Sequence, residues 1–167
     1  MTFHPIGHYE TQYSLTTGAP RQGTLMPETH GKIILDKQYA EGLKELPDFE
    51  YIWVLYVFDK ETGWDAIVRP PESHHSFGVF ATRSPRRPNP IGLSLNRLDS
   101  IRGNILYVSG IDVFNQTPVL DIKPFLPSVD YVKSPKTEAA EEFLGHHDED
   151  FINDTLVKEF VKGEKIF

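Results

Sequence analysis

Cysteine is absent from the 167 residues of this chain. Its absence excludes disulfide bonds, thiolate metal sites and cysteine nucleophiles together, and it is typical of a reducing compartment. No apolar run is long enough to cross a bilayer. The first ten residues, MTFHPIGHYE, lack the basic start and the apolar core of a signal peptide. The sequence therefore predicts a cytoplasmic protein with no membrane span.

Several signatures of nucleotide-binding and hydrolytic enzymes are also missing. The chain has no glycine-rich phosphate loop, no G-x-G-x-x-G after a strand and no G-x-S-x-G turn. Nucleotide hydrolysis, Rossmann-type dinucleotide binding and serine hydrolysis therefore lack their usual signals. His74-His75 and His146-His147 are adjacent pairs without the spacing of helical metal ligands, so we interpret them as surface histidines in polar loops and expect no metal.

The charge of the chain is unevenly distributed. Its net charge of −7 argues against nonspecific binding to nucleic acid, because that binding needs cations facing the phosphates. Residues 138–167 hold nine carboxylates against three lysines. In contrast, a segment in the middle of the chain carries six arginines against Glu72 and Asp99, namely Arg69, Arg83, Arg86, Arg87, Arg97 and Arg102. The chain thus has a basic middle followed by an acidic end.

Short β-branched and aromatic runs separated by Gly, Pro, Asn and Asp predict a mostly β protein. The candidate strands are KIIL (32–35), YIWVLYVF (51–58), FGVFA (77–81), GLSLNRL (92–98), NILYVSGI (104–111) and PVLDIKP (118–124). The second run is apolar throughout, which indicates a central strand covered on both faces, whereas 92–98 alternates and should be half exposed. Many short strands favour a small antiparallel barrel or a tightly curled sheet.

Local signals add a hairpin and a few helices. Arg102-Gly103-Asn104 predicts a tight turn between two of the strands. Asp36 is a candidate cap for a helix that ends at Pro47, and residues 136–144 and 152–163 have helical periodicity. We expect a barrel domain over 1–132 and a short, acidic, helical extension over 133–167.

The stretch ATRSPRRPNPIGLS, residues 81–94, combines three arginines with three prolines. Proline fixes its own φ and restricts the residue before it, so the loop should be stiff. A stiff loop holds guanidinium groups in place at low entropic cost, which suits recognition of an anion or a nucleotide. The alternative is a connector whose arginines are solvated or paired with the acidic end of the chain.

Together with its neighbours, this stretch has a recognisable pattern. The run GVFATRSPRRPNPIGLS at 78–94 resembles the signature of the TsaA-like family, whose characterised members are TrmO-type tRNA methyltransferases. HPIG at 4–7, GAPRQG at 18–23 and TPVLDIKPFLP at 117–127 agree in order and spacing. The resemblance covers residues 4 to about 130. The family has Asp-Gly where this chain has Asn115-Gln116.

The resemblance implies a barrel-like homodimer that binds S-adenosylmethionine outside the Rossmann framework. It also implies methylation of N6 of a threonylcarbamoyl-modified adenosine beside the tRNA anticodon. We expect Arg86 and Arg87 to face the RNA, and no catalytic base is assigned. The cofactor contacts implied are Pro20, Arg21, Gln22, Phe58, Asp59, Arg83, Leu93, Thr117, Pro118, Val119, Leu120 and Asp121.

The chemistry of the cofactor leaves some roles open. Arg83 or Arg21 could bind its carboxylate, and Asp59 or Asp121 could meet a cationic or hydroxyl group, although Arg83 and Asp121 could instead form an internal ion pair. Methyl transfer is an in-line displacement, so alignment of the reactants can supply much of the acceleration. Two other functions remain open at this stage, namely a methyltransferase acting on a small molecule or another RNA, and a noncatalytic barrel that binds nucleotides or RNA.

Overall fold

A computed structural model describes residues 2–70, 73–132, 134, 136 and 137 of the chain. Its strands are β1 (Gly7–Glu10), β2 (His30–Leu35), β3 (Tyr51–Val57), β4 (Ile67–Val68), β5 (Phe77–Gly78), β6 (Ile91–Arg102), β7 (Ile105–Ser109) and β8 (Pro118–Pro124). Its helices are the 3₁₀ turns η1 (Gly23–Leu25), η2 (Lys37–Leu43), η3 (Leu46–Asp48) and η4 (Val79–Ala81), and the α-helix α1 (Pro127–Asp130).

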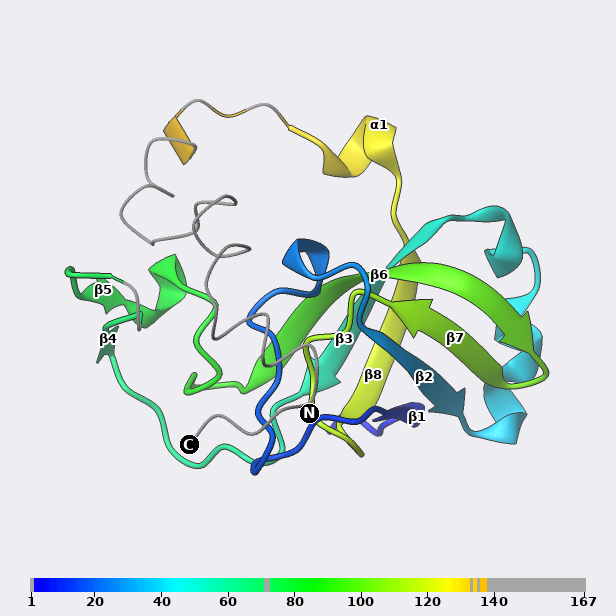
Figure 1. Cartoon of the computed structure of the whole chain (residues 1–167), viewed down its shortest axis with the longest axis horizontal. Coiled ribbons are helices and arrows are strands. Elements are labelled where there is room, and N and C mark those ends of the chain that lie inside the picture. Colours follow the sequence, from blue (N-terminus) through cyan, green and yellow to red (C-terminus); the bar gives the residue numbers. More distant parts are fainter. Residues whose placement is uncertain (1, 71–72, 133, 135, 138–167) are drawn as a thin grey trace.

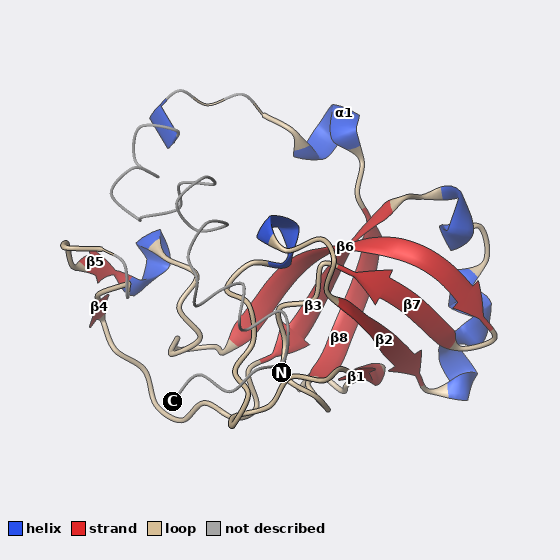
Figure 2. Cartoon of the chain, viewed as in Figure 1, coloured by secondary structure: helices blue, strands red, loops and turns tan. Residues whose placement is uncertain are grey.

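Six strands form a closed barrel in the order β1-β2-β7-β6-β3-β8, and every neighbouring pair is antiparallel. The barrel occupies one side of the molecule, and the short helices lie outside it (Figures 1 and 2). The strands β4 and β5 form a separate two-stranded sheet on an arm that leaves the barrel between β3 and β6 (Figure 1). The prediction of a mostly β fold with an antiparallel barrel is therefore confirmed.

The hairpin predicted around residues 102–104 joins β6 to β7, with Gly103 at a φ of 61°. Strand β6 turns an unusual face inward, because Ser94 and Asn96 are buried while Leu93 is 44% exposed on the outside. Polar side chains inside a barrel need hydrogen-bond partners. The interior of this barrel must therefore contain a polar network.

That network crosses the barrel from β1 to the segment after β7. The hydroxyl of Tyr9 donates to Oδ1 of Asn96 at 2.6 Å, and Nδ2 of Asn96 donates to the carbonyl of Gly110 at 2.6 Å. Tyr9 also packs edge-on against Tyr56, with ring centroids 6.0 Å apart. Around this network the core is aliphatic, and it includes Ile33, Ile52, Val54, Leu106, Val108 and Val119.

The helix predicted after Asp36 is present only as 3₁₀ turns, and Asp36 makes no side-chain capping bond. The apolar residues of this segment, Ala40, Leu43 and Leu46, recur every third residue, which matches the three residues per turn of a 3₁₀ helix. The prediction of a capped helix was therefore wrong in type.

The strand predicted at 77–81 is wrong in its second half, where η4 replaces it. The reason is that the carbonyl of Val79 accepts hydrogen bonds from the backbone and hydroxyl of Thr82 and from Arg87, so it cannot join a ladder. The run at 51–58 forms β3, but its burial alternates instead of being complete on both faces. Its outer face is partly covered at Trp53, whose ring packs against Phe125 and whose Nε1 donates to Asp130 in α1.

Strands β1 and β4 were not predicted from the sequence. Over the residues that the structure describes, no helix is long and apolar enough to cross a membrane. Nor do those same residues gather three or more histidine or acidic side chains into a metal-binding group. The helical periodicity within 138–167, the second histidine pair and most of the expected acidic extension lie outside the described residues.

Candidate functional site

The loop at the start of the stretch 81–94, which we call the proline-arginine loop, meets the segment after residue 18 at one end of the barrel. Nη1 of Arg83 donates to Oε1 of Gln22, although the two residues are 61 positions apart in the chain. Nε2 of Gln22 donates in turn to the carbonyl of Arg21 at 2.7 Å, which fixes the orientation of the Gln22 amide. Pro20 is buried beside them. Two of the predicted cofactor segments are therefore adjacent.

Gly23, which follows Gln22, anchors this segment to the barrel. Its backbone amide donates to Oδ2 of Asp112 at 3.0 Å. The approach to the segment 110–112 is very close, because a Cβ on Gly23 would lie 1.7 Å from the carbonyl oxygen of Gly110. Only glycine permits such an approach without moving the backbone.

Asp112 connects the anchored segment to the barrel interior. Ser94 donates its hydroxyl to Oδ1 of Asp112 at 2.5 Å, and the hydroxyl of Tyr56 lies 3.2 Å from the same serine oxygen. Burial raises the pKa of Asp112 to about 6, against the opposing effects of hydrogen bonds from Ser94 and Gly23 and of the charge on Arg83. Burial and the nearby carboxylate raise the pKa of Tyr56 well above its usual value.

Phe58 and Asp59, two further residues that the resemblance assigns to the cofactor, directly follow β3. Phe58 packs edge-on against Tyr56 at 5.2 Å, and its amide donates to the carbonyl of Pro90 at 2.8 Å. Phe58 is thereby held next to both the barrel network and the proline-arginine loop. Asp59 forms an ion pair with Lys60.

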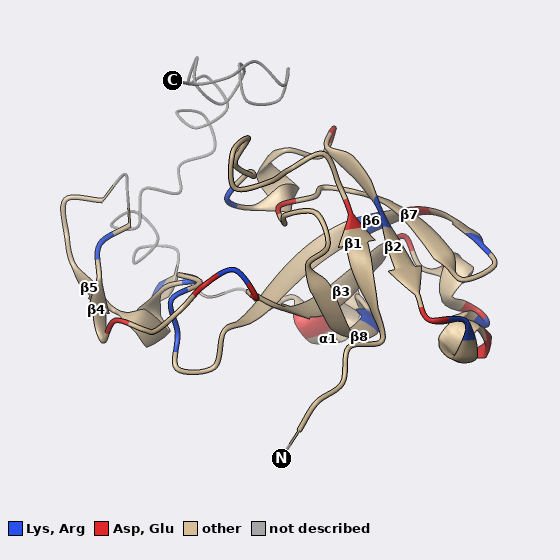
Figure 3. Cartoon of the chain, turned by 90° about the horizontal axis from the view of Figure 1, so that it is seen from below, with Lys and Arg blue, Asp and Glu red and all other residues tan. Residues whose placement is uncertain are grey.

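The other two arginines of the loop have partners within the arm. Nε of Arg86 donates to Asp65 at 2.7 Å in an ion pair whose two side chains are about half exposed. Nη1 of Arg87 donates to the carbonyls of Val79, Thr82 and Ser84, and its guanidinium lies 5.9 Å from the ring centroid of Phe80. The arm accordingly carries both basic and acidic residues (Figure 3).

The TPVLD segment, residues 117–121, has one end close to these residues. We call the set formed by Arg83, Gln22, Gly23, Asp112, Ser94, Tyr56 and Phe58 the Arg83 cluster. The carbonyl of Thr117 accepts the amide of Tyr9 at 3.0 Å, and Val119 pairs with Tyr56. Gln116 before it has a φ of 67°, so this glutamine adopts the left-handed conformation at the position where the family pattern has glycine. The turn is held by the amide of Gln116, which donates to the carbonyl of Tyr9 at 2.8 Å.

Asp121 and Leu93 lie apart from the Arg83 cluster. Asp121 forms an ion pair with Lys123 at 2.7 Å and lines a groove of about 560 Å³ beside η2 and η3. The ion pair between Arg83 and Asp121, one of the alternatives from the sequence, is therefore absent. Leu93 faces outward from β6, where it pairs with Leu55 of β3.

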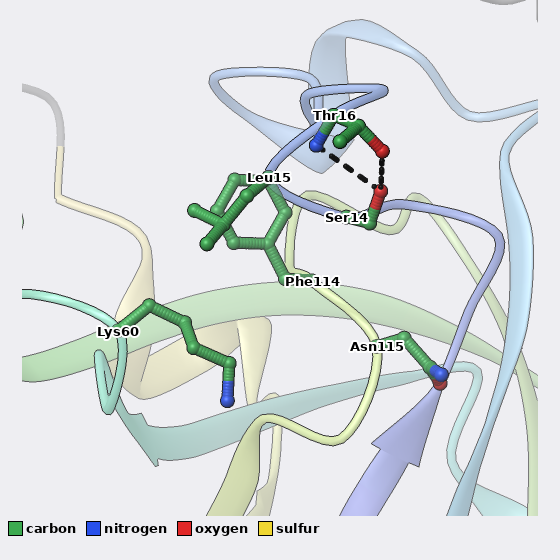
Figure 4. A pocket seen from close by; sticks show the side chains of 6 residues that line it. All are labelled: Ser14, Leu15, Thr16, Lys60, Phe114 and Asn115. Atoms are coloured by element: carbon green, nitrogen blue, oxygen red, sulfur yellow. Dashed lines mark hydrogen bonds between the residues drawn. The ribbon is translucent and has the colours of Figure 1, made fainter.

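A smaller cavity of about 260 Å³ opens next to two of the predicted segments. Its lining is Ser14, Leu15, Thr16, Lys60, Phe114 and Asn115 (Figure 4). Ser14 accepts the backbone amide of Thr16 at 3.3 Å, so the hydroxyl groups on this side are engaged within the 14–18 turn. Lys60 directly follows Asp59, and Asn115 lies two residues before Thr117, so the cavity is close in the chain to both predicted cofactor segments.

Comparison with known proteins identifies the family. A family model described as the tRNA-methyltransferase O N-terminal domain matches residues 8–131. The chain belongs to the tRNA-methyltransferase O family. The matched region contains the residues of the Arg83 cluster and nearly the whole barrel.

Individual members of the tRNA-methyltransferase O family agree with this assignment. A tRNA (adenine(37)-N6)-methyltransferase of Escherichia coli is 36% identical, and the match covers 95% of this chain and 74% of that protein. The rat protein of the same name is 39% identical over 75% of this chain, which spans only 31% of the rat protein. The crystal structure of TrmO from Pseudomonas aeruginosa has a TM-score of 0.68 at 33% identity, covering 81% of this chain and 60% of that one.

Sequence reasoning missed Asp112, Ser94 and Tyr56. The signal for Ser94 was present in β6, where Ser94 and Asn96 share a face with Leu98. A buried leucine at the end of a polar row indicates that the polar side chains also point into the core. The partner Asp112 follows the next strand, at the end of the hairpin where it faces that row.

Proposed function

We propose that this protein is an S-adenosylmethionine-dependent methyltransferase that acts on N6 of the adenosine next to the tRNA anticodon. The observation that carries the proposal is the contact between Arg83 and Gln22 at the barrel end, which joins two motifs of the tRNA-methyltransferase O family. The names of the relatives support the reaction, and the cytoplasm remains the compartment that we propose for it.

The residues of the Arg83 cluster suit the chemistry of S-adenosylmethionine. The guanidinium of Arg83 and the amide of Gln22 are donors for a carboxylate, and Phe58 offers an aromatic surface beside them. Pro20, Arg21, Asp59 and the segment from Thr117 to Val119 would complete the binding surface.

Bound in this place, S-adenosylmethionine would supply an activated methyl group. The chain's own contribution is to orient the reactants, because an in-line displacement gains much of its acceleration from alignment. The hydrogen bonds from Gly23 to Asp112 and from Arg83 to Gln22 hold the segment around Gln22 against the barrel and against the proline-arginine loop, which supports that alignment. The acceptor nitrogen can lose its proton after transfer, so a dedicated base is not required.

Arg86 and Arg87 are proposed to contribute to RNA binding. Replacing both by alanine should raise the KM for tRNA and flatten the salt dependence of binding by up to about two units of slope, because each phosphate contact contributes about one. Arg86→Ala alone should reduce the slope by about one unit. This single variant also leaves in place the hydrogen bonds from Arg87 to three loop carbonyls. Filter binding from low to high salt measures the slope, with Arg102→Ala at the β6–β7 turn as control. An unchanged slope in the double variant would remove both arginines from the RNA surface.

The homodimer implied by the family resemblance is also proposed here. Support comes from the outer face of β3 and β6, where Leu55 pairs with Leu93 and Val57 with Ile91, and where Ile91 is 42% exposed. Light scattering should give twice the 19.1 kDa mass of the chain. Ile91→Asp should shift that mass toward the monomer, whereas Val129→Asp, on exposed α1, should not. A monomeric mass for the unsubstituted protein would rule out the dimer.

The reaction is tested with radiolabelled S-adenosylmethionine and bulk tRNA prepared with and without the threonylcarbamoyl group. Label in the modified tRNA alone supports the proposed acceptor, and label in both preparations supports methylation without that specificity. Cofactor binding without label in either tRNA would favour another acceptor. A protein that does not bind the cofactor would be the noncatalytic barrel of the sequence alternatives.

A further inference from the structure

Asp112 belongs to none of the motifs that define the family resemblance, yet both of its carboxylate oxygens are bound. Oδ2 accepts the amide of Gly23 at 3.0 Å, and Oδ1 accepts the hydroxyl of Ser94 at 2.5 Å. The first partner lies directly after Pro20-Arg21-Gln22, and the second lies on the inner face of β6. Asp112 therefore connects the loop that carries Gln22 to strand β6 of the barrel.

A carboxylate in this place is costly for the fold. Burial raises the pKa of Asp112 to about 6, which means that the ionised form destabilises the folded protein at neutral pH and that protonation relieves this cost as the pH falls. An asparagine in its place could accept only one of the two hydrogen bonds, because its amide nitrogen is a donor, so both partners require a carboxylate. Charged groups that are kept in unfavourable surroundings are frequent at functional sites.

The negative charge of Asp112 interacts with Arg83, the residue that Gln22 contacts. Arg83 donates to Gln22, and its charge lowers the pKa of both Asp112 and Tyr56. The cation and the carboxylate thus interact across the Gln22-Gly23 peptide. If that peptide shifted, the Gln22 side chain and the guanidinium bound to it would shift as well.

We propose that Asp112 is a positioning residue that fixes the Gln22-Gly23 segment and, through Gln22, places Arg83 for the amino-acid end of the cofactor. This inference rests on the proposed function for the identity of the ligand. The role of Asp112 is indirect, because it acts through the amide of Gly23 and is not assigned any contact with the reacting atoms.

The ionised carboxylate is the better acceptor for both donors, because hydrogen bonds to charged groups are stronger. Cofactor affinity should therefore fall as the pH falls through about 6, where Asp112 takes up a proton. The other titratable or charged groups that act on Asp112 are Arg83 from the loop and, through their own electrostatic coupling to it, Tyr9 of β1 and Tyr56 of β3. Burial raises the pKa of both tyrosines, so neither changes its charge near pH 6, and an inflection there that Asp112→Asn removes belongs to Asp112.

The inference is tested with the unsubstituted protein, Asp112→Asn and the control Asp99→Asn. Asp99 also accepts a serine hydroxyl, that of Ser109 at 3.1 Å, but it lies away from the Arg83 cluster. Without ligand, the NMR resonance of the Gly23 amide should titrate with a midpoint near pH 6 in the unsubstituted protein and in Asp99→Asn. The same titration should be absent in Asp112→Asn.

Calorimetry with S-adenosylmethionine from pH 5 to 7.5 supplies the second measurement. Affinity of Asp112→Asn should be about three- to tenfold weaker at pH 7.5, and its pH profile should lack the inflection near 6. Because the ligand titrates identically with each protein, the difference between profiles belongs to the protein. Should Asp112→Asn not fold, Ser94→Ala replaces it, and loss of the serine donor should move the Gly23 midpoint to higher pH.

The outcomes separate this inference from the proposed function. If the unsubstituted protein binds S-adenosylmethionine and Asp112→Asn keeps the same affinity and the same pH profile, Asp112 has no positioning role and the proposed function stands. If the unsubstituted protein does not bind the cofactor, both proposals are overturned. A Gly23 amide that does not titrate in any of the variants would contradict the hydrogen bond on which the inference is built.

Discussion

Arg83→Ala should weaken the binding of S-adenosylmethionine about 10- to 150-fold. A hydrogen bond to a charged group contributes about 1.5–3 kcal/mol, and Arg83 is expected to make such bonds to the cofactor carboxylate. Loss of the guanidinium also frees Gln22, which Arg83 holds in place. Calorimetry at neutral pH with S-adenosylmethionine and with its demethylated product measures both affinities, which should fall together because both ligands carry the carboxylate.

Arg102→Ala is the matched control for this substitution. Its guanidinium lies 5.4 Å from the ring centroid of Tyr107 on the β6–β7 hairpin, and its removal takes away the same charge. Cofactor affinity should be unchanged in that variant. Equal losses in the two variants would show that net charge, and not the Arg83 contact, controls binding.

Gly23→Ala should reduce the free energy of unfolding by about 3 kcal/mol or more, which is the upper range for inserting an atom into a packed site. The added Cβ would lie 1.7 Å from the Gly110 carbonyl oxygen, and a backbone atom cannot rotate away as a flexible side chain can. The required shift would also break the bond from the Gly23 amide to Asp112. Urea denaturation measures the first effect and calorimetry with the cofactor the second.

Gly42→Ala controls for the general effect of replacing a glycine. Among the described residues, no atom beyond the chain neighbours and the nearby backbone of η2 lies within 4 Å of a Cβ at that position, so the variant should be as stable as the unsubstituted protein. If Gly23→Ala were equally stable, the two segments would not be in the close contact on which the site depends.

The barrel could be predicted from the sequence because its strands are short, apolar and separated by turn residues. The strand predicted at 118–124 has the same bounds as β8, and the predicted turn has Gly103 in the left-handed conformation. Two errors had local causes. The third-residue spacing of Ala40, Leu43 and Leu46 fits a 3₁₀ helix as well as an α-helix, and the strand after Gly78 ends because Arg87 and Thr82 engage the Val79 carbonyl.

The candidate site was only partly accessible from the sequence. Motifs identified Gln22 and Arg83, which the fold brings into contact. They did not identify Asp112, because a lone aspartate after a strand carries no local pattern, and its role depends on the distant partners Gly23 and Ser94. Asp121 shows the reverse case, since it lies within a motif but pairs with Lys123 beside another groove.

The most direct test of the central claim is to locate the methyl group that the protein transfers. tRNA carrying threonylcarbamoyladenosine beside the anticodon would be incubated with the protein and S-adenosylmethionine, digested, and analysed by mass spectrometry of its nucleosides. We predict that the threonylcarbamoyladenosine peak is replaced by a form heavier by one methyl group on N6, and that Arg83→Ala slows this conversion far more than Arg102→Ala does. A nucleoside profile that stays unchanged while the protein binds the cofactor would contradict the assignment of tRNA as the acceptor.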